Sequence, residues 1–359
     1  MRWLGVSVAL FLSILPAGIR AGEEQNPFAP YPTPAGLERE IRELAAAHPD
    51  RVTLLEYGKS VEGRPLLCLH IGRPGRVGMP AAWIGGCIHG NEWIGSRLAM
   101  AMARMLIADD GRDPDITAAL DRLDFFVAPC LNPDAFQRTF EHPELAGGIA
   151  GSGMTLSAEQ GGAGWSVIRK NAHGVDLNRN FPLPGKPLAP IDWAGSPDPL
   201  SVHYRGPRPL SEPETAALDS FFRDHPEIVA ALSWHSTAAV MYPAHCPSHA
   251  CMVRYGKMCR AFQQNQPHRR YPRMQSRVFD SYTGEMEDWL YAEYGVLATD
   301  VEIGTSGQNR KACDCDSLFW TFNPKNPDYW VENDAKAGIA ALAAAERALS
   351  GRRIPPSER

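Results

Sequence analysis

The sequence predicts an α/β fold: a single domain with a mixed, mostly parallel central sheet flanked by helices. Apolar runs of strand length alternate along the chain with longer stretches of helical periodicity, as expected of α/β domains. The composition, with 44% apolar and 21% charged residues among 359, is that of an ordinary globular chain of one large domain or two small ones. Disorder and a coiled coil are therefore not expected for most of the chain.

The individual elements follow from local patterns. A helix is expected at 37–47, after Thr33 and Pro34, and the segments 51–58 and 65–72 are expected to form a hairpin. Further strands are expected at 81–88, at the start of 123–136, at 228–236 and at 296–304. Further helices are expected at 92–108, 211–225, 285–295 and 334–350.

Three local features carry more specific expectations. Ser211 and Glu214 have the spacing of a capping box, which predicts a helix opening there. Residues 141–165 are rich in Gly, Ser and Ala and are expected to form a surface loop or an insertion. The segment "RKNAHGVDLNRNFP", residues 169–182, is expected to form a short strand and a turn.

The N-terminal residues have the pattern of a secretory signal peptide at 1–21. Arg2 supplies the positive region, Leu4 to Leu15 the apolar region, and Ala17 or Ala21 a cleavage site. An uncleaved membrane anchor is the alternative, but stable membrane insertion is not expected because the apolar run is short. We expect a secreted or periplasmic chain with its catalytic domain at 27–350 and a polar tail at 351–359. The net charge of −5 provides no basic field that would indicate nucleic acid.

A histidine and a glutamate stand three residues apart in the Gly-rich turn "GCIHGNEWIG". Imidazole and carboxylate are zinc ligands, and three such ligands plus a water form a catalytic zinc site. His89 and Glu92 could thus share one ion. Alternatively, His89 caps the following helix and Glu92 complements its N-terminal dipole.

Two arginines and several asparagines lie in the segment 169–182. A guanidinium group pairs bidentately with carboxylates, so Arg169 and Arg179 are candidates for binding a substrate carboxylate or a developing oxyanion. The alternative for either arginine is a surface salt bridge.

Seven segments together resemble the zinc metallocarboxypeptidases, the M14 peptidases, in the order that the family has them. The resemblance covers about Tyr31 to Glu302. The segments are "GKSVEGRPL", "HGNE", "NPDAF", "RKNAHGVDLNRNFP", "YRGPRPLSEPET", "WHST…MYP" and "DVEIG". Some of them also resemble the murein peptide amidase branch of this family.

The resemblance implies a centre with one zinc ion. His89, Glu92 and His235 are similar to the zinc ligands of the family. Asp176 is similar to the aspartate that orients the first zinc histidine through its other ring nitrogen. Glu302 is similar to the general base, which takes a proton from zinc-activated water.

The resemblance also implies a site for the C-terminal residue of a peptide. Arg169 is similar to the arginine that stabilises the oxyanion, and Asn178 and Arg179 to the pair that binds the free carboxylate. The family's tyrosine aligns with another residue here, so Tyr282, two residues later, is the candidate to replace it. Glu287 aligns with the residue that reads the departing side chain, where a carboxylate would favour a basic group; the alternative for Glu287 is a solvated helix face.

These residues favour an exported zinc metallocarboxypeptidase whose partner is a peptide with a free C-terminal carboxylate. Three alternatives stay open. A murein peptide amidase would cut the γ-D-glutamyl-diaminopimelate bond of cell-wall peptides. A non-catalytic binding protein could use the same fold. A deacylase of small N-acyl amino acids would share the zinc chemistry.

Overall fold

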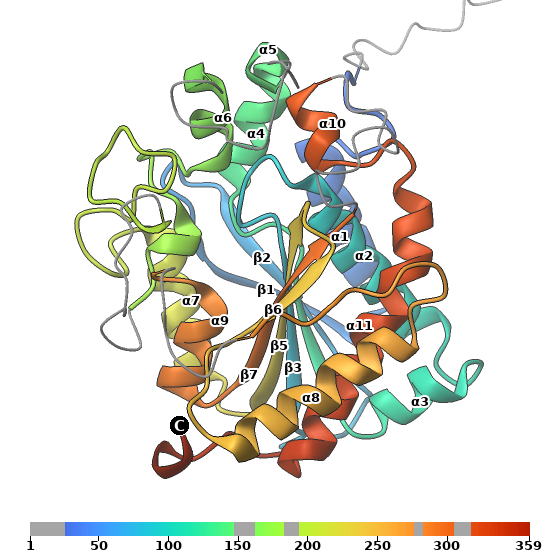
Figure 1. The fold of residues 1–359 in the computed structure, drawn as a ribbon. Helices are drawn as coiled ribbons and strands as arrows, with labels where there is room; N and C mark the ends of the chain where they lie inside the picture. The colour runs from blue at the N-terminus through green and yellow to red at the C-terminus, as the bar shows by residue number, and fades with distance from the viewer. Residues whose placement is uncertain (1–25, 147–161, 183–193, 276–282, 305–316) are drawn as a thin grey trace, which may run out of the picture.

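A seven-stranded sheet runs through the centre of the molecule (Figure 1). The structure, a computed structural model, describes residues 26–146, 162–182, 194–275, 283–304 and 317–359. The strand order is β1-β2-β4-β3-β5-β7-β6. The strands are β1 (Val52–Lys59), β2 (Pro65–Ile71), β3 (Ala81–Gly86), β4 (Asp124–Ala128), β5 (Ile228–Ser236), β6 (Val240–Pro243) and β7 (Leu297–Ile303).

The four central strands, β4, β3, β5 and β7, are parallel. Strands β1, β2 and β6 pair antiparallel at the two sides of this parallel core. The mixed, mostly parallel sheet expected from the sequence is therefore confirmed. Because the carboxyl ends of the four central strands meet at one edge, that edge is where such a sheet places its ligands.

Helices cover both faces of the sheet (Figure 1). The longer ones are α1 (Pro34–Ala47), α2 (Trp93–Ala108), α7 (Pro213–Asp224), α8 (His249–Gln264) and α11 (Pro327–Leu349). The shorter ones are α3 (Pro114–Leu120), α4 (Pro133–Glu141), α5 (Pro143–Ala146), α6 (Gly162–Arg169), α9 (Met286–Trp289) and α10 (Leu318–Phe322). Single turns occur at η1 (Leu177–Arg179), η3 (Leu290–Tyr294) and η4 (Pro356–Glu358).

Two apolar clusters, one on each side of the sheet, hold the layers together. Neighbouring residues of β3 point to opposite faces, so Ile84 joins the cluster with α2, α8 and α11, while Trp83 joins the cluster with α7 and α9. All six residues of β3 and all nine of β5 are buried. Burial on both faces explains why these strands read as continuous apolar runs.

Several local expectations are confirmed. The first helix begins at Pro34, where the Thr33 side chain accepts a hydrogen bond of 3.0 Å from the Gly36 amide. Strands β1 and β2 form the expected antiparallel hairpin. The helical segment before β7 ends at Gly295, whose φ of 68° is the left-handed conformation common after helices.

Two local expectations are wrong, and a third is wrong at the two ends of its segment. Helix α7 begins at Pro213 after Glu212, and Ser211 and Glu214 form no capping box, since the Glu214 carboxylate accepts from the Val61 amide instead. The loop expected at 141–165 contains α5 and the start of α6, while 147–161 lie outside the described residues. No strand forms in the described residues 169–182, because Arg169 ends α6 and 177–179 form a single helical turn.

The N-terminal signal expected at 1–21 lies outside the described residues. Within the part of the chain that the structure describes, we find no helix with the length and apolar character needed to span a bilayer.

Candidate active site

The turn between β3 and α2 places His89 and Glu92. His89 lies three residues beyond β3, and Glu92 immediately precedes α2. A Cβ on Gly86 would lie 2.6 Å from the backbone of Gly95, so glycine at this position lets the helix start close to the strand. A Cβ on Gly90 would lie 2.1 Å from that of Ala135, against α4. The glycines of this turn therefore set where the two polar side chains lie.

His235 and Glu302 come from adjacent parallel strands. They pair directly across β5 and β7, near the carboxyl end of each strand. Both strands end at the edge that carries His89, so the three segments meet where ligands are expected in a parallel sheet.

The side chains of His89, Glu92 and His235 converge on one point. The Nδ1 atom of His89 lies 2.9 Å from Glu92 Oε1, and the Nδ1 atom of His235 lies 3.3 Å from Glu92 Oε2. The two Nδ1 atoms are 3.3 Å apart, and one ligand atom from each of the three residues lies within 4.8 Å of the others. The three residues are buried, with exposed fractions of 1–3%.

This donor set fits a zinc ion. Two imidazole nitrogens and one carboxylate are the ligands found in many catalytic zinc sites, where a fourth position stays open. The charges of Asp300 and Glu92 raise the pKa of His235 well above its ordinary value, although burial alone would lower it. A concentration of negative charge around buried imidazoles is the environment that favours a cation.

Asp176 connects His89 to Arg169. Asp176 Oδ1 lies 3.3 Å from His89 Nε2, the ring nitrogen that faces away from Glu92. Asp176 Oδ2 accepts from Arg169 Nε at 3.0 Å and lies 2.9 Å from Arg169 Nη2. Burial alone would raise the pKa of Asp176, but the charges of Arg169 and His89 hold that pKa well below its ordinary value.

Arg169 also lies near the converging ligands. Its Nη1 atom is 3.8 Å from Glu92 Oε1. A guanidinium held by one buried carboxylate and placed beside a second is a fixed positive charge next to the candidate metal position.

Glu302 has an environment that favours its neutral form. Its Oε2 atom is buried and has no hydrogen-bonding partner among the described residues. Burial and the negative charges of Glu92 and Asp300 raise the pKa of Glu302 to about 7, although His235 and Arg169 act in the opposite direction. A carboxylate with a raised pKa beside a metal-ligand cluster is suited to accepting and returning a proton.

Asn178 and Arg179 lie in the η1 turn next to the segment before α9. The Asn178 side chain donates to Asp300 Oδ2 at 3.1 Å and accepts from the Met286 amide at 2.9 Å. Arg179 Nη1 lies 3.3 Å from Glu285 Oε1. Arg179 therefore already contacts one carboxylate of the chain, in a setting where a substrate carboxylate could take that place.

Glu287 is buried rather than solvated. Its exposed fraction is 3%, and its Oε2 atom has no hydrogen-bonding partner among the described residues. One oxygen each from Glu285, Glu287 and Asp288 lie within 4.8 Å of one another. The solvated helix face is therefore the wrong alternative for Glu287. Tyr282 lies outside the described residues.

Asp300 is a site residue that the sequence analysis missed. Its Oδ2 atom lies 3.1 Å from His235 Nε2, and its side chain is 7% exposed. The signal that could have found it is the strand period of two, because a residue two positions before Glu302 on β7 faces the same side of the sheet.

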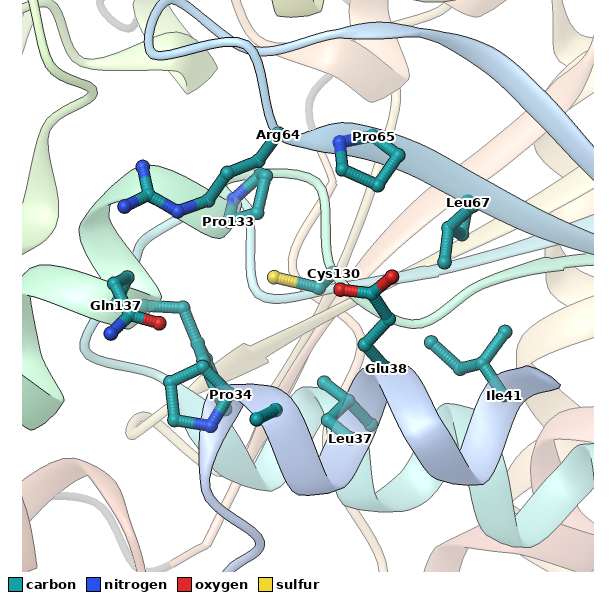
Figure 2. A pocket seen from close by; sticks show the side chains of 12 residues that line it. Pro34, Leu37, Glu38, Ile41, Arg64, Pro65, Leu67, Cys130, Pro133 and Gln137 are labelled. Carbon is teal, nitrogen blue, oxygen red and sulfur yellow. The ribbon is translucent and has the colours of Figure 1, made fainter. Parts of the chain in front are cut away.

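A separate pocket lies between α1, β2 and the start of α4 (Figure 2). The side chains of Glu38 and Cys130 point into it. None of the residues predicted to belong to the site lines this pocket. It is therefore distinct from the metal-ligand cluster.

Comparison with known proteins places this chain in a family. The family model described as zinc carboxypeptidase matches residues 37–333. The chain belongs to the zinc carboxypeptidase family.

Individual relatives agree with this assignment. Carboxypeptidase A1 of Sus scrofa is 35% identical over 202 residues, which are 56% of this chain and 43% of the relative. Carboxypeptidase A6 of Mus musculus is 30% identical over 224 residues, which are 59% of this chain and 46% of the relative. The matched part of this chain thus spans less than half the length of these curated relatives.

Solved structures share the fold. Thrombin-activatable fibrinolysis inhibitor has a TM-score of 0.67 at 20% identity, covering 89% of this chain and 75% of that chain. Carboxypeptidase A from Helicoverpa armigera has a TM-score of 0.63 at 21% identity, and the match covers 89% of this chain and 73% of that chain.

Proposed function

We propose that this chain is an exported, zinc-dependent metallocarboxypeptidase that releases the C-terminal residue of peptides. The observation that carries the proposal is the convergence of His89, Glu92 and His235 beside Glu302. The expected signal at 1–21 supports export.

His89, Glu92 and His235 would hold one zinc ion. Asp176 would orient the His89 ring through the Nε2 atom of His89. When bound there, zinc supplies a Lewis acid that polarises the scissile carbonyl and makes water acidic enough to attack at neutral pH.

Glu302 is the proposed general base. It takes a proton from the attacking water and returns it to the departing amine, which requires a carboxylate whose two protonation states are both accessible near neutral pH. Its Oε2 atom is buried with no partner in the part of the chain that the structure describes, and this and its raised pKa suit the role. Arg169, fixed by Asp176 beside Glu92, would stabilise the negative charge that develops on the carbonyl oxygen.

Asn178 and Arg179 are proposed to bind the free carboxylate of the substrate. Holding that carboxylate one residue beyond the scissile bond would confine cleavage to chain ends. A substrate carboxylate would compete with Glu285 for Arg179. Tyr282 stays a candidate for a further substrate contact.

Glu287 is proposed to favour a basic departing residue. A buried carboxylate oxygen that has no partner in the described segments gains most from a cationic side chain. The same observation suits diaminopimelate, whose side chain carries an amine, so a murein peptide amidase is the second candidate.

The test is mass spectrometry of the products that the zinc-loaded protein makes from a small substrate panel. The panel holds peptides ending in Lys, Arg, Leu, Phe and Glu, and the tripeptide L-Ala-γ-D-Glu-diaminopimelate. Release of single C-terminal residues from the peptides, with Lys and Arg preferred, is the expected result. Cleavage of the murein peptide alone would move the function to cell-wall turnover. Binding without cleavage by both the wild type and Glu302→Gln would indicate a binding protein.

A further inference from the structure

Strand β7 carries a second carboxylate toward the site. Asp300 stands two residues before Glu302, so both side chains lie on the same face of the sheet. It pairs with Ser233 of β5, just as Glu302 pairs with His235. Asp300 is 5% exposed, so its carboxylate lies inside the protein.

One oxygen of Asp300 serves the metal-ligand cluster. Oδ2 lies 3.1 Å from His235 Nε2 and accepts from Asn178 Nδ2 at 3.1 Å. The Ser233 hydroxyl lies 3.1 Å from the same His235 nitrogen. A carboxylate at Nε2 fixes the ring and places the proton on that nitrogen. The Nδ1 lone pair is then directed at the point that His89 and Glu92 also face.

The other oxygen of Asp300, Oδ1, takes no part in these contacts. Oδ1 is buried and has no hydrogen-bonding partner among the described residues, as is also true of Glu287 Oε2. Asn178, which donates to Asp300 Oδ2, also accepts from the amide of Met286, the residue before Glu287, so the two carboxylates belong to one part of the site. Burial raises the pKa of Glu287 well above its ordinary value, and the charge of Asp300 raises it further. Arg179, a cation on this side of the site, is in contact with Glu285. Two buried carboxylate oxygens that lack a partner within the described part of the chain are costly unless a cation or a hydrogen-bond donor joins them.

We propose that Asp300 is shared by two parts of the site: it positions the zinc ligand His235, and together with Glu287 it binds the cationic group of the departing side chain. The ligand class is an ammonium or guanidinium group at the end of an aliphatic side chain. This inference rests on the proposed carboxypeptidase function and names the side-chain class of its substrate.

The test compares Asp300→Asn with Glu287→Gln in two measurements. The first is the ratio of kcat/KM for peptides ending in Lys and in Leu. The second is the zinc Kd, from competition with a chromophoric chelator. Asparagine keeps the shape and the oxygen that faces His235 and Asn178, but it removes the charge. Glu293→Gln, on the exposed side of the following turn, is the control for loss of one negative charge.

Both site variants are expected to lower the Lys-to-Leu ratio by about tenfold. Asp300→Asn is also expected to weaken zinc binding by about tenfold or more. Glu287→Gln alters a side chain whose Oε2 atom has no hydrogen-bonding partner among the described residues, and this variant is expected to keep the wild-type zinc Kd. If Asp300→Asn only disturbed the structure, kcat/KM would fall by the same factor for both peptides. An unchanged ratio or an unchanged zinc Kd in Asp300→Asn would overturn the proposal.

A wild-type measurement covers the case in which Asp300→Asn does not fold. A crystal structure of the zinc-loaded wild type with free L-lysine is expected to place the ammonium within about 3.2 Å of Asp300 Oδ1. A lysine side chain bound elsewhere would overturn the inference. If the wild type releases no residue from any peptide, the proposed function fails instead, and the zinc Kd alone still tests the role of Asp300 at His235.

Discussion

At the scale of the residue, the protonation of Glu302 is set by its surroundings. Burial and two neighbouring carboxylates favour the neutral form, while two neighbouring cationic groups oppose them. A general base must be unprotonated when water attacks, so this balance determines the pH range in which the protein can work.

The acid limb of the pH profile follows from that balance. The pKa of Glu302 is raised from 4.5 to about 7, and a bound zinc ion would lower it again because a nearby cation favours the carboxylate. We expect kcat/KM to rise about tenfold per pH unit through a limb between these two values and to be lost below it. The measurement is a pH profile of the zinc-loaded wild type. A profile that is flat from pH 4 to 8 would contradict the role of Glu302.

Removing the base should separate metal binding from turnover. Glu302→Gln is expected to lower kcat by a factor of about 10²–10⁴, the usual contribution of a general base, while zinc content stays at the wild-type level. The measurement is kcat together with zinc content by mass spectrometry. Retained activity in the zinc-loaded variant would show that another group accepts the proton.

At the scale of the element, the close approach of β3 and α2 holds the first two metal ligands. A Cβ on Gly86 would meet the backbone of Gly95 at 2.6 Å. Backbone cannot move aside as a flexible side chain can. The position of Glu92 at the start of α2 therefore depends on the absence of a side chain at Gly86.

Gly86→Ala should destabilise the fold by about 1–3 kcal/mol, the usual cost of overpacking, and weaken zinc binding as well. Gly256→Ala is the control, because its Cβ would meet only the end of the Arg273 side chain at 3.3 Å, in the middle of α8. An alanine there is expected to stabilise the helix by up to about 1 kcal/mol. Denaturant unfolding of both variants checks this. Equal stability of the two would show that α2 can shift freely.

The elements differ in how well the sequence predicts them. The strands β3 and β5 and the helix α2 are long or fully apolar. Their pattern of apolar residues is therefore enough to predict them from the sequence. The capping box of Ser211 and Glu214 at the start of α7 was mispredicted because Glu214 accepts from Val61, 153 residues away, and the local sequence pattern does not contain that contact. The short helices α5 and α6 likewise depend on tertiary packing, because helices of this length are not stable on their own.

At the scale of the whole molecule, the site is assembled from segments far apart in the chain. His89 and His235, 146 residues apart, have Nδ1 atoms 3.3 Å from each other. Order along the chain and family resemblance were enough to name these residues and Glu302. The position of Asp300 depends on register between β5 and β7, and its contact with His235 could not be read from spacing alone.

Zinc should therefore stabilise the whole fold, since it binds segments that are brought together only in the folded state. At a free zinc concentration a thousandfold above Kd, the gain is about 4 kcal/mol, which corresponds to a Tm rise of about 6 °C for a domain of more than 300 residues. The measurement is a thermal scan after chelation and after zinc is restored. His235→Ala is expected to show no zinc-dependent rise. A wild-type Tm that does not change with zinc would contradict a single zinc site shared by these segments.

The most direct test of the central claim is cleavage of a matched pair of peptides by the zinc-loaded protein. The two peptides have the same sequence ending in Lys, one with a free C-terminal carboxylate and the other with a C-terminal amide. We predict release of lysine from the free acid and no comparable release from the amide. The release from the free acid is expected to be lost in Glu302→Gln. Equal cleavage of the two peptides, or cleavage inside the chain, would contradict a carboxypeptidase that recognises the carboxylate through Asn178 and Arg179.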